Sequence, residues 1–161
     1  MSVHRSKLKL LERHHVWNGA AWRGIYGDGE DGVAVLVQLG SERTSRAGVE
    51  AAREEAAFVL EETAPGVLRL LDVVEHDRRV AWVYEDFDGV GLLMFAGDAS
   101  ETVVPARVAS ELVAQVVEVL VGLPGPVRHP GPEDSDVLVD DAGVVRLSGF
   151  VGPGARSPRL F

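Results

Sequence analysis

Few side chains in this sequence are suited to chemistry, and most of them are histidines and carboxylates. His129, Asp134 and Asp136 lie close together in the chain. Imidazole and carboxylate groups of this kind can move a proton or bind a divalent cation. No nucleophile, complete metal-ligand set or acid–base pair accompanies them, so they do not define an active site of a known kind. Asp136 is the one residue that we keep as a candidate cation ligand.

Other polar groups have simpler structural explanations. The string Asp140-Asp141-Ala142-Gly143 has the composition of a hairpin turn. His14 and His15 are adjacent, and adjacent residues on a strand point to opposite faces, so they rarely bind the same ion. The chain has no cysteine, which excludes disulfides, zinc–thiolate sites and cysteine nucleophiles. We therefore predict no cofactor.

Composition narrows the class of protein further. The chain has 161 residues, of which 46% are hydrophobic, as expected for one folded unit. A net charge of -9 argues against nucleic-acid binding through a general basic face. No stretch approaches the ~18 apolar residues of a transmembrane helix, and the N-terminus lacks the apolar run of a signal peptide. We expect a cytoplasmic protein that binds neither nucleic acid nor membranes.

Hydrophobic periodicity predicts an α+β fold whose main sheet is antiparallel. Pro65-Gly66 should end a first helix, and Pro105 fits the first turn of a second, longer helix. Glycine-rich or polar turns separate the strands. The expected strands cover about 16–26, 33–39, 68–75, 79–84, 137–140 and 144–147, and the expected helices cover 49–63 and 105–121.

The order of these elements resembles a eukaryotic-type Ser/Thr protein kinase of the bacterial sort, over roughly residues 10–152. No single string is specific, but the strings occur in the family's order at suitable intervals. The resemblance implies a small lobe over 1–86 and the first part of a large lobe over 87–161, within one unit. It is carried by Val33-Ala34-Val35-Leu36 (the nucleotide-lysine strand), Arg53-Glu54-Glu55-Ala56 (the regulatory helix), Leu71 to Asp77 (the small-lobe hairpin), Val83 to Gly89 (the hinge), His129 to Val139 (the catalytic loop) and Val145 to Phe150 (the strand before the metal motif).

The positions that carry kinase chemistry are changed in this sequence. Kinases need a strand lysine, a catalytic aspartate, and an aspartate and an asparagine that hold magnesium. The lysine position falls on Leu36, or on Gln38 in a shifted register, and the only lysines are Lys7 and Lys9. The catalytic aspartate, the metal aspartate and the metal asparagine are replaced by Gly131, Gly149 and Asp136. We therefore predict a pseudokinase that does not transfer phosphate.

By the same resemblance, the glycine-rich loop is also altered, and the regulatory glutamate has lost its usual partner. Gly19 is the one glycine of the loop that remains, and bulky residues such as Trp17 would keep backbone amides away from phosphates. Glu55 stands at the place of the glutamate that normally pairs with the strand lysine. Without that lysine, we interpret Glu55 as a solvated helix residue.

The resemblance leaves a degenerate nucleotide pocket open as an alternative function. Its walls would be formed by Ala21, Ala34, Tyr84 and Leu138. Apolar walls can hold a purine without magnesium, which would make the chain a nucleotide-binding sensor. Tyr84, at the gatekeeper position, is large enough to fill the pocket instead.

The helix expected over 105–121 is apolar on most sides. Other parts of a protein usually cover such a helix on more than one side. The chain ends about ten residues after Gly149-Phe150-Val151, so we expect the helices that the resemblance would place over it to be lacking. We predict an interface on this helix for a protein partner or a homodimer. The alternative is a core helix that 122–136 and 152–161 cover. The expected interface residues are Val108, Leu112, Val116, Val119 and Leu120.

Overall fold

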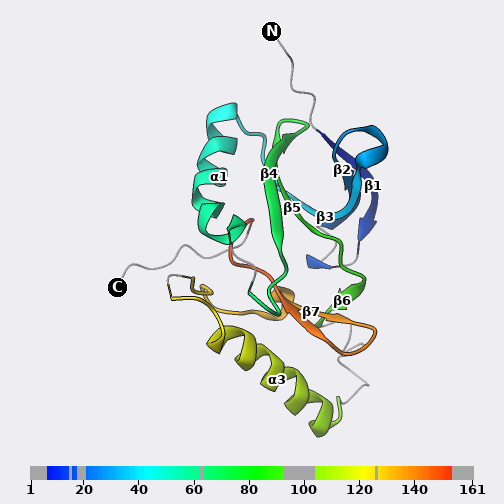
Figure 1. Ribbon diagram of the computed structural model, residues 1–161, viewed down its shortest axis with the longest axis vertical. Coiled ribbons are helices and arrows are strands. Elements are labelled where there is room, and N and C mark those ends of the chain that lie inside the picture. Colours follow the sequence, from blue (N-terminus) through cyan, green and yellow to red (C-terminus); the bar gives the residue numbers. More distant parts are fainter. Residues whose placement is uncertain are drawn as a thin grey trace.

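The computed structural model describes residues 7–14, 16–17, 21–61, 64–92, 104–125 and 127–153. Two antiparallel sheets follow one another along the chain (Figure 1). The larger has five strands in the order β1-β2-β3-β5-β4, and the smaller has three in the order β6-β7-β8. The strands are β1 (Leu8–His14), β2 (Ala21–Tyr26), β3 (Val33–Leu39), β4 (Leu70–His76), β5 (Arg79–Glu85), β6 (Gly89–Gly91), β7 (Val137–Asp140) and β8 (Val145–Leu147).

The two longer helices lie beside different sheets. Helix α1 (Arg46–Leu60) connects β3 to β4 and packs on the larger sheet, while α3 (Ala106–Val121) lies below the smaller sheet (Figure 1). The Ser45 side chain caps α1 by accepting a hydrogen bond from the Gly48 amide at 3.3 Å. Short 3₁₀ turns occur at Gly29–Asp31 and Asp134–Asp136. The expected α+β fold with an antiparallel main sheet is confirmed.

Sequence reasoning misses two strands. β1 carries charged residues, among them Lys9 and Glu12, and lies at an edge of the larger sheet. Edge strands commonly carry charge, which weakens the apolar alternation by which strands are recognised. The three residues of β6 include two glycines, a composition that favours a connector over a strand. Of the first expected strand, 16–26, the structure confirms Ala21–Tyr26 as β2, whereas Val16 and Trp17 are not in a strand and 18–20 lie outside the described residues.

The larger sheet buries side chains on both faces. One face forms the main core together with α1, α3 and the smaller sheet, and it includes Leu36, Leu70 and Tyr84. The other face holds a separate cluster that includes Val35, Val37 and Val83. The hydroxyl of Tyr26 on β2 donates a hydrogen bond to Asp72 on β4, although these strands are not neighbours in the sheet. The sheet must therefore curl, so that its second face closes on itself.

The segment after α1 joins the two halves of the molecule. The Leu147 amide donates to the Gly66 carbonyl at 2.8 Å, and the Leu68 amide donates to the Leu147 carbonyl at 2.9 Å. Gly66 has φ +78°, and a Cβ placed there would lie 2.3 Å from Cγ2 of Val119 on α3. This close approach requires glycine. Among the described residues, no helix is both long enough and apolar enough to cross a bilayer.

Candidate functional site

The position that resembles the kinase lysine is part of the hydrophobic core. Leu36 lies in the middle of β3, opposite Tyr84 of β5, and its side chain is fully buried. Gln38, which takes the lysine position in the shifted register, is on the same face of the strand. A Cβ at Gly152 would lie 2.7 Å from the Gln38 Oε1 atom, so the backbone at 152 closes over this amide. Neither residue offers a cation to a phosphate.

Trp17 fills the space between the two sheets next to Tyr84. Its side chain is only 8% exposed, and it belongs to the same core cluster as Leu36 and Tyr84. The indole and phenol ring centres are 5.2 Å apart and tilted by 49°. The indole Nε1 donates a hydrogen bond to the Ser148 hydroxyl at 2.9 Å, across 131 positions of sequence. The indole thus fills part of the core that the two sheets share.

The four residues expected to line a nucleotide pocket do not all lie in one place. Ala21 and Leu138 are fully buried in the core cluster that contains Tyr84. Ala34, on β3, is exposed instead and is outside that cluster. Burial raises the pKa of the Tyr84 phenol above its ordinary value, and the nearby Asp136 carboxylate adds to the effect. Tyr84 therefore stays neutral and packs as a core residue.

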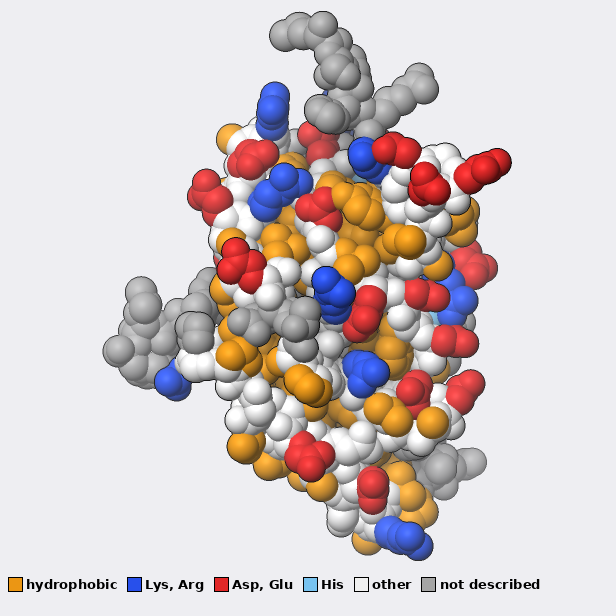
Figure 2. Space-filling model, viewed as in Figure 1, with side chains coloured by type: hydrophobic (Ala, Val, Ile, Leu, Met, Phe, Trp, Pro, Cys, Tyr) orange, Lys and Arg blue, Asp and Glu red, His pale blue; other side chains and the backbone are white. Residues whose placement is uncertain are grey.

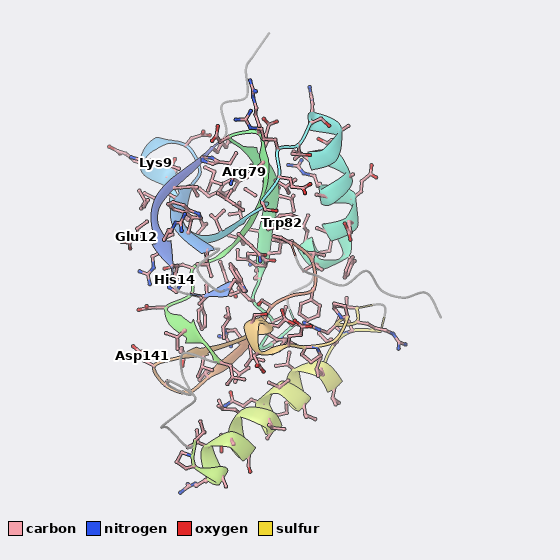
Figure 3. The ribbon with its side chains drawn as sticks, turned by 180° about the vertical axis from the view of Figure 1, so that it is seen from behind. Lys9, Glu12, His14, Arg79, Trp82 and Asp141 are labelled. Carbon is pink, nitrogen blue, oxygen red and sulfur yellow. The ribbon has the colours of Figure 1, made fainter. Side chains whose placement is uncertain are left out.

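An ion pair bridges the two sheets outside this core. The Arg23 guanidinium on β2 lies 3.0 Å from the Asp88 carboxylate, just before β6. Both side chains are substantially exposed, at 37% and 86%, so the pair contributes little to stability. His14, at the end of β1, lies beside it, and Figure 3 shows this strand end near the junction of the sheets. His15 is outside the described residues.

His129 has a structural role. Its Nδ1 accepts a hydrogen bond from the Gly131 amide at 3.1 Å, so in the neutral ring Nε2 carries the proton. Nε2 then donates to the Ser148 carbonyl at 2.7 Å. The ring also makes an edge contact with Phe150, with centres 4.7 Å apart. These contacts connect the loop at 129–131 to the strand end at 148–150.

Asp136 and Gly149 are in close contact. Gly149 has φ +85°, and a Cβ there would lie 2.0 Å from the Asp136 Oδ1 atom. The other carboxylate oxygen accepts the Glu133 amide at 2.9 Å and lies 3.7 Å from His129 Nε2. Partial burial is the main cause that raises the pKa of Asp136 above its ordinary value of 3.8. Asp136 thus lies against Gly149, the position at which the resemblance would place a metal-binding aspartate.

The remaining candidate carboxylates have the expected simple roles or stay unassigned. The Asp140 Oδ1 atom accepts the Ala142 and Val144 amides, both at 2.9 Å, which closes the hairpin turn. Asp134 lies exposed in the 3₁₀ turn, and Glu55 is exposed on α1. Within the described residues, no group of three or more His, Asp or Glu side chains is arranged to hold a metal ion.

Some apolar residues of α3 face the protein core, and others face solvent. Of the expected interface residues, Leu112 and Val119 are buried in this chain's own core, and Val108, Val116 and Leu120 pack partly against it. Leu112 and Val119 are therefore not free to meet a partner, whereas an interface that includes Val108, Val116 and Leu120 stays a prediction. The exposed apolar residues are those of a different stripe, which we call the valine stripe: Val113, Val117 and Val121, with exposed fractions of 61%, 51% and 80%.

Coverage of α3 comes in part from the loop after it. Val127 is buried in the core cluster, and Leu123 packs partly against it. Gln115 adds polar contacts on the inward side: its amide donates to the Gly143 carbonyl and accepts from the Val145 amide, each at 2.9 Å. Of the C-terminal segment that was expected to help, 154–161 is outside the described residues.

Trp17 and Ser148 are the site residues that sequence reasoning does not bring together. The bulk of Trp17 in a loop expected to be glycine-rich is a signal that phosphates would be excluded there. Nothing in the sequence indicates that its partner is Ser148, which is 1% exposed. No family model matches this chain, and no curated protein is significantly similar to it.

Proposed function

We propose that this chain is a catalytically inactive, kinase-like protein that functions by binding protein through the valine stripe of α3. Two features support the kinase-like part. The strand order β1-β2-β3-β5-β4, with α1 inserted between β3 and β4, is the arrangement that the resemblance implies for a small lobe. A smaller antiparallel sheet and a long helix then follow, as in the first part of a large lobe.

Three replaced positions support the lack of catalysis. A fully buried Leu36 cannot neutralise phosphate charge, and Gly131 has no group that accepts a proton from a substrate hydroxyl. Gly149 provides no carboxylate for magnesium and lies too close to Asp136 for a larger side chain. Trp17, whose loop would be glycine-rich by the resemblance, is packed between Tyr84 and Ser148. Contact with another macromolecule is the function left for such a scaffold.

The valine stripe is the observation that carries the binding proposal. Its residues recur at every fourth position, so they form one line along α3. Small exposed residues flank that line, namely Ala106, Ser110 and Ala114, which allows another helix to approach closely. Figure 2 shows hydrophobic side chains along the lower part of the molecule, where α3 lies. An uncovered line of large aliphatic residues is unusual on a surface that nothing contacts.

A second copy of this chain is the occupant that we propose. A straight apolar line flanked by small residues is self-complementary, as the interface of a two-fold dimer must be. Ridges formed by residues four apart can pack into the grooves of the same ridges on another helix. The net charge of -9 per chain opposes association, and salt weakens that repulsion. We therefore expect a dimer that strengthens as ionic strength rises.

Sedimentation velocity from about 1 to 100 µM protein, at low and high salt, tests this proposal. Val113→Gln with Val117→Gln should abolish association, because both changes place amides in the apolar line. The control is Glu111→Gln with Glu118→Gln, exposed positions of the same helix outside the valine stripe. Because it removes two negative charges, it should not weaken association. A monomer under all conditions, or equal loss in both pairs, would refute the homodimer.

Thermal unfolding with ATP or ADP, with and without magnesium, tests the nucleotide-sensing alternative. Ligands that bind the folded state raise the unfolding midpoint. We expect no saturable rise for the natural chain, because the Trp17 and Tyr84 rings pack against each other in the core. A saturable rise that Ala34→Trp abolishes would favour the sensor and would make nucleotide binding the function to pursue.

A further inference from the structure

The larger sheet has two edge strands, and they are protected in different ways. β1 lies at one edge and carries charged residues together with a shift of register between Leu10 and Glu12. Charges and irregularities of this kind commonly keep another strand from pairing with an edge. β4 lies at the other edge, and Val73 and Val74 occupy its middle. Valine favours strand pairing, so the edge of β4 requires another form of protection.

The backbone of Val73 faces this free edge and is already occupied. Its amide donates a hydrogen bond to Asp72 Oδ1 at 2.8 Å. Its carbonyl accepts two hydrogen bonds from Arg53 on α1, from Nε at 3.1 Å and from Nη2 at 2.7 Å. These bonds lead to α1 and to β4 itself, and not to β5. An added strand would need both backbone groups, because antiparallel strands exchange N–H···O=C pairs at alternate residues. Val73 therefore cannot join a further ladder while these contacts persist.

The Asp72 side chain is held in position from two other elements of the fold. Its Oδ2 atom accepts a hydrogen bond from the Tyr26 hydroxyl on β2, and its Oδ1 atom lies 3.4 Å from Arg53 Nη2 on α1. Figure 1 shows α1 beside β4, with which it is in contact. The Arg53 and Asp72 side chains are 45% and 27% exposed, so their ion pair adds little to stability. Its effect lies in the backbone groups that the two side chains occupy.

We infer that Arg53 and Asp72 form an edge cap, which keeps a second copy of this chain from pairing its β4 with the β4 of this one. Two identical strands that pair antiparallel are related by a two-fold axis, so an uncovered β4 edge would be complementary to itself. Because Arg53 belongs to α1, the edge cap is in place only while α1 lies against β4. The inference goes beyond the proposed function and does not rest on it, because the valine stripe is on a different helix.

Sedimentation velocity of Arg53→Ala tests the edge cap. The change is made in the Val113→Gln, Val117→Gln background, so that association through the valine stripe does not contribute. At protein concentrations where this background is a monomer, adding Arg53→Ala should shift the sedimentation coefficient to that of a dimer. A chain that stays monomeric after Arg53→Ala would overturn the inference.

Two further variants show whether the contacts of Arg53 are responsible. Arg53→Lys should restore most of the monomer, because an ammonium group still donates a hydrogen bond to the Val73 carbonyl. The matched control is Arg46→Ala, which removes an exposed arginine from the first position of the same helix and should stay monomeric. Equal association of Arg46→Ala and Arg53→Ala would show that a lost positive charge, and not an uncovered edge, is the cause.

Hydrogen exchange at the β4 amides locates the contact and remains decisive if Arg53→Ala does not fold. Glu75 is two residues from Val73, so its backbone groups face the same edge, outside the edge cap. In the natural chain, the Val73 amide should exchange roughly 10-fold or more slowly than the Glu75 amide. In the Arg53→Ala dimer, the Glu75 amide should become protected, because a second β4 would cover it. Equal exchange of both amides in the natural chain, or a dimer that leaves Glu75 unprotected, would refute the edge cap.

Discussion

Replacing Gly149 with alanine should destabilise the protein much more than the added methyl group suggests. Gly149 adopts φ +85°, where a residue with a Cβ pays about 1 kcal/mol or somewhat more. The new Cβ would also lie 2.0 Å from Asp136 Oδ1 and 2.4 Å from Asp136 Cγ. Forcing a group into a packed site costs typically 1–3 kcal/mol. Together these effects lower the free energy of unfolding by roughly 2–4 kcal/mol.

Asp136 cannot move away from this clash without further loss. Its other carboxylate oxygen accepts the Glu133 amide in a capping box, so rotating the side chain would break that bond. For a domain of this size, each 1 kcal/mol shifts the thermal midpoint by about 2–4 °C. We expect Gly149→Ala to unfold roughly 5–15 °C below the natural chain, measured by circular dichroism or calorimetry.

Gly143→Ala is the matched control, because Gly143 has φ +77° and a Cβ added there would meet nothing within 4 Å. It should show only the cost of the backbone conformation, about 1 kcal/mol. In an Asp136→Ala background, Gly149→Ala should also fall to that smaller cost, as a double-mutant cycle would reveal. If Gly149→Ala costs no more than Gly143→Ala, the close packing of Gly149 against Asp136 is refuted. If it costs more, placing any larger side chain at 149 would require changes around it.

Two titratable groups give further predictions. Burial raises the pKa of Asp136 above 3.8, so the folded state holds this proton more tightly than the unfolded state does. The contribution of Asp136 to the free energy of unfolding is therefore full below pH 3.8 and is lost as pH rises through the raised pKa. Asp136→Asn should flatten that part of the pH profile in denaturant unfolding between pH 3.5 and 7; an unchanged profile would contradict the assignment. Burial, together with the hydrogen bond to Asp72, raises the pKa of Tyr26 to about 12, so the free energy of unfolding should fall between pH 10 and 12. Tyr26→Phe should remove this fall and cost about 0.5–1.5 kcal/mol at neutral pH, whereas ultraviolet titration of a Tyr26 phenol at pH 10 would refute the buried contact.

Local signals in the sequence are sufficient to predict the helices, turns and strands in the interior of the fold. The expected strands at 68–75 and 79–84 leave the polar residues His76, Asp77 and Arg78 for the turn between them. The structure places Asp77 and Arg78 at φ +49° and +60°, as a tight hairpin requires. The second helix is expected over 105–121 and is found at Ala106–Val121. These features depend on residues near one another in the chain. β1 is missed because a charged edge strand is recognised by its partner, β2, and not by its own pattern.

The face of α3 that packs inward could not be read from its sequence. Apolar residues cover more than half of the helix circumference, so periodicity favours no single buried side. Tertiary packing decides the question: Val119 meets the backbone at Gly66, and Gln115 pairs with the β7–β8 turn. These two contacts fix the rotation of the helix and leave Val113 and Val117 outside.

The sequence alone determined which reactive groups the chain lacks: it has no cysteine, no lysine after Lys9, and no carboxylate at 131 or 149. These are properties of residue identity and need no fold. Only the tertiary structure decided what fills the space between the sheets. Trp17 and Ser148 are 131 positions apart, and no local preference links them. They meet because both sheets bury one face in the same core, and a buried indole N–H must find an acceptor there.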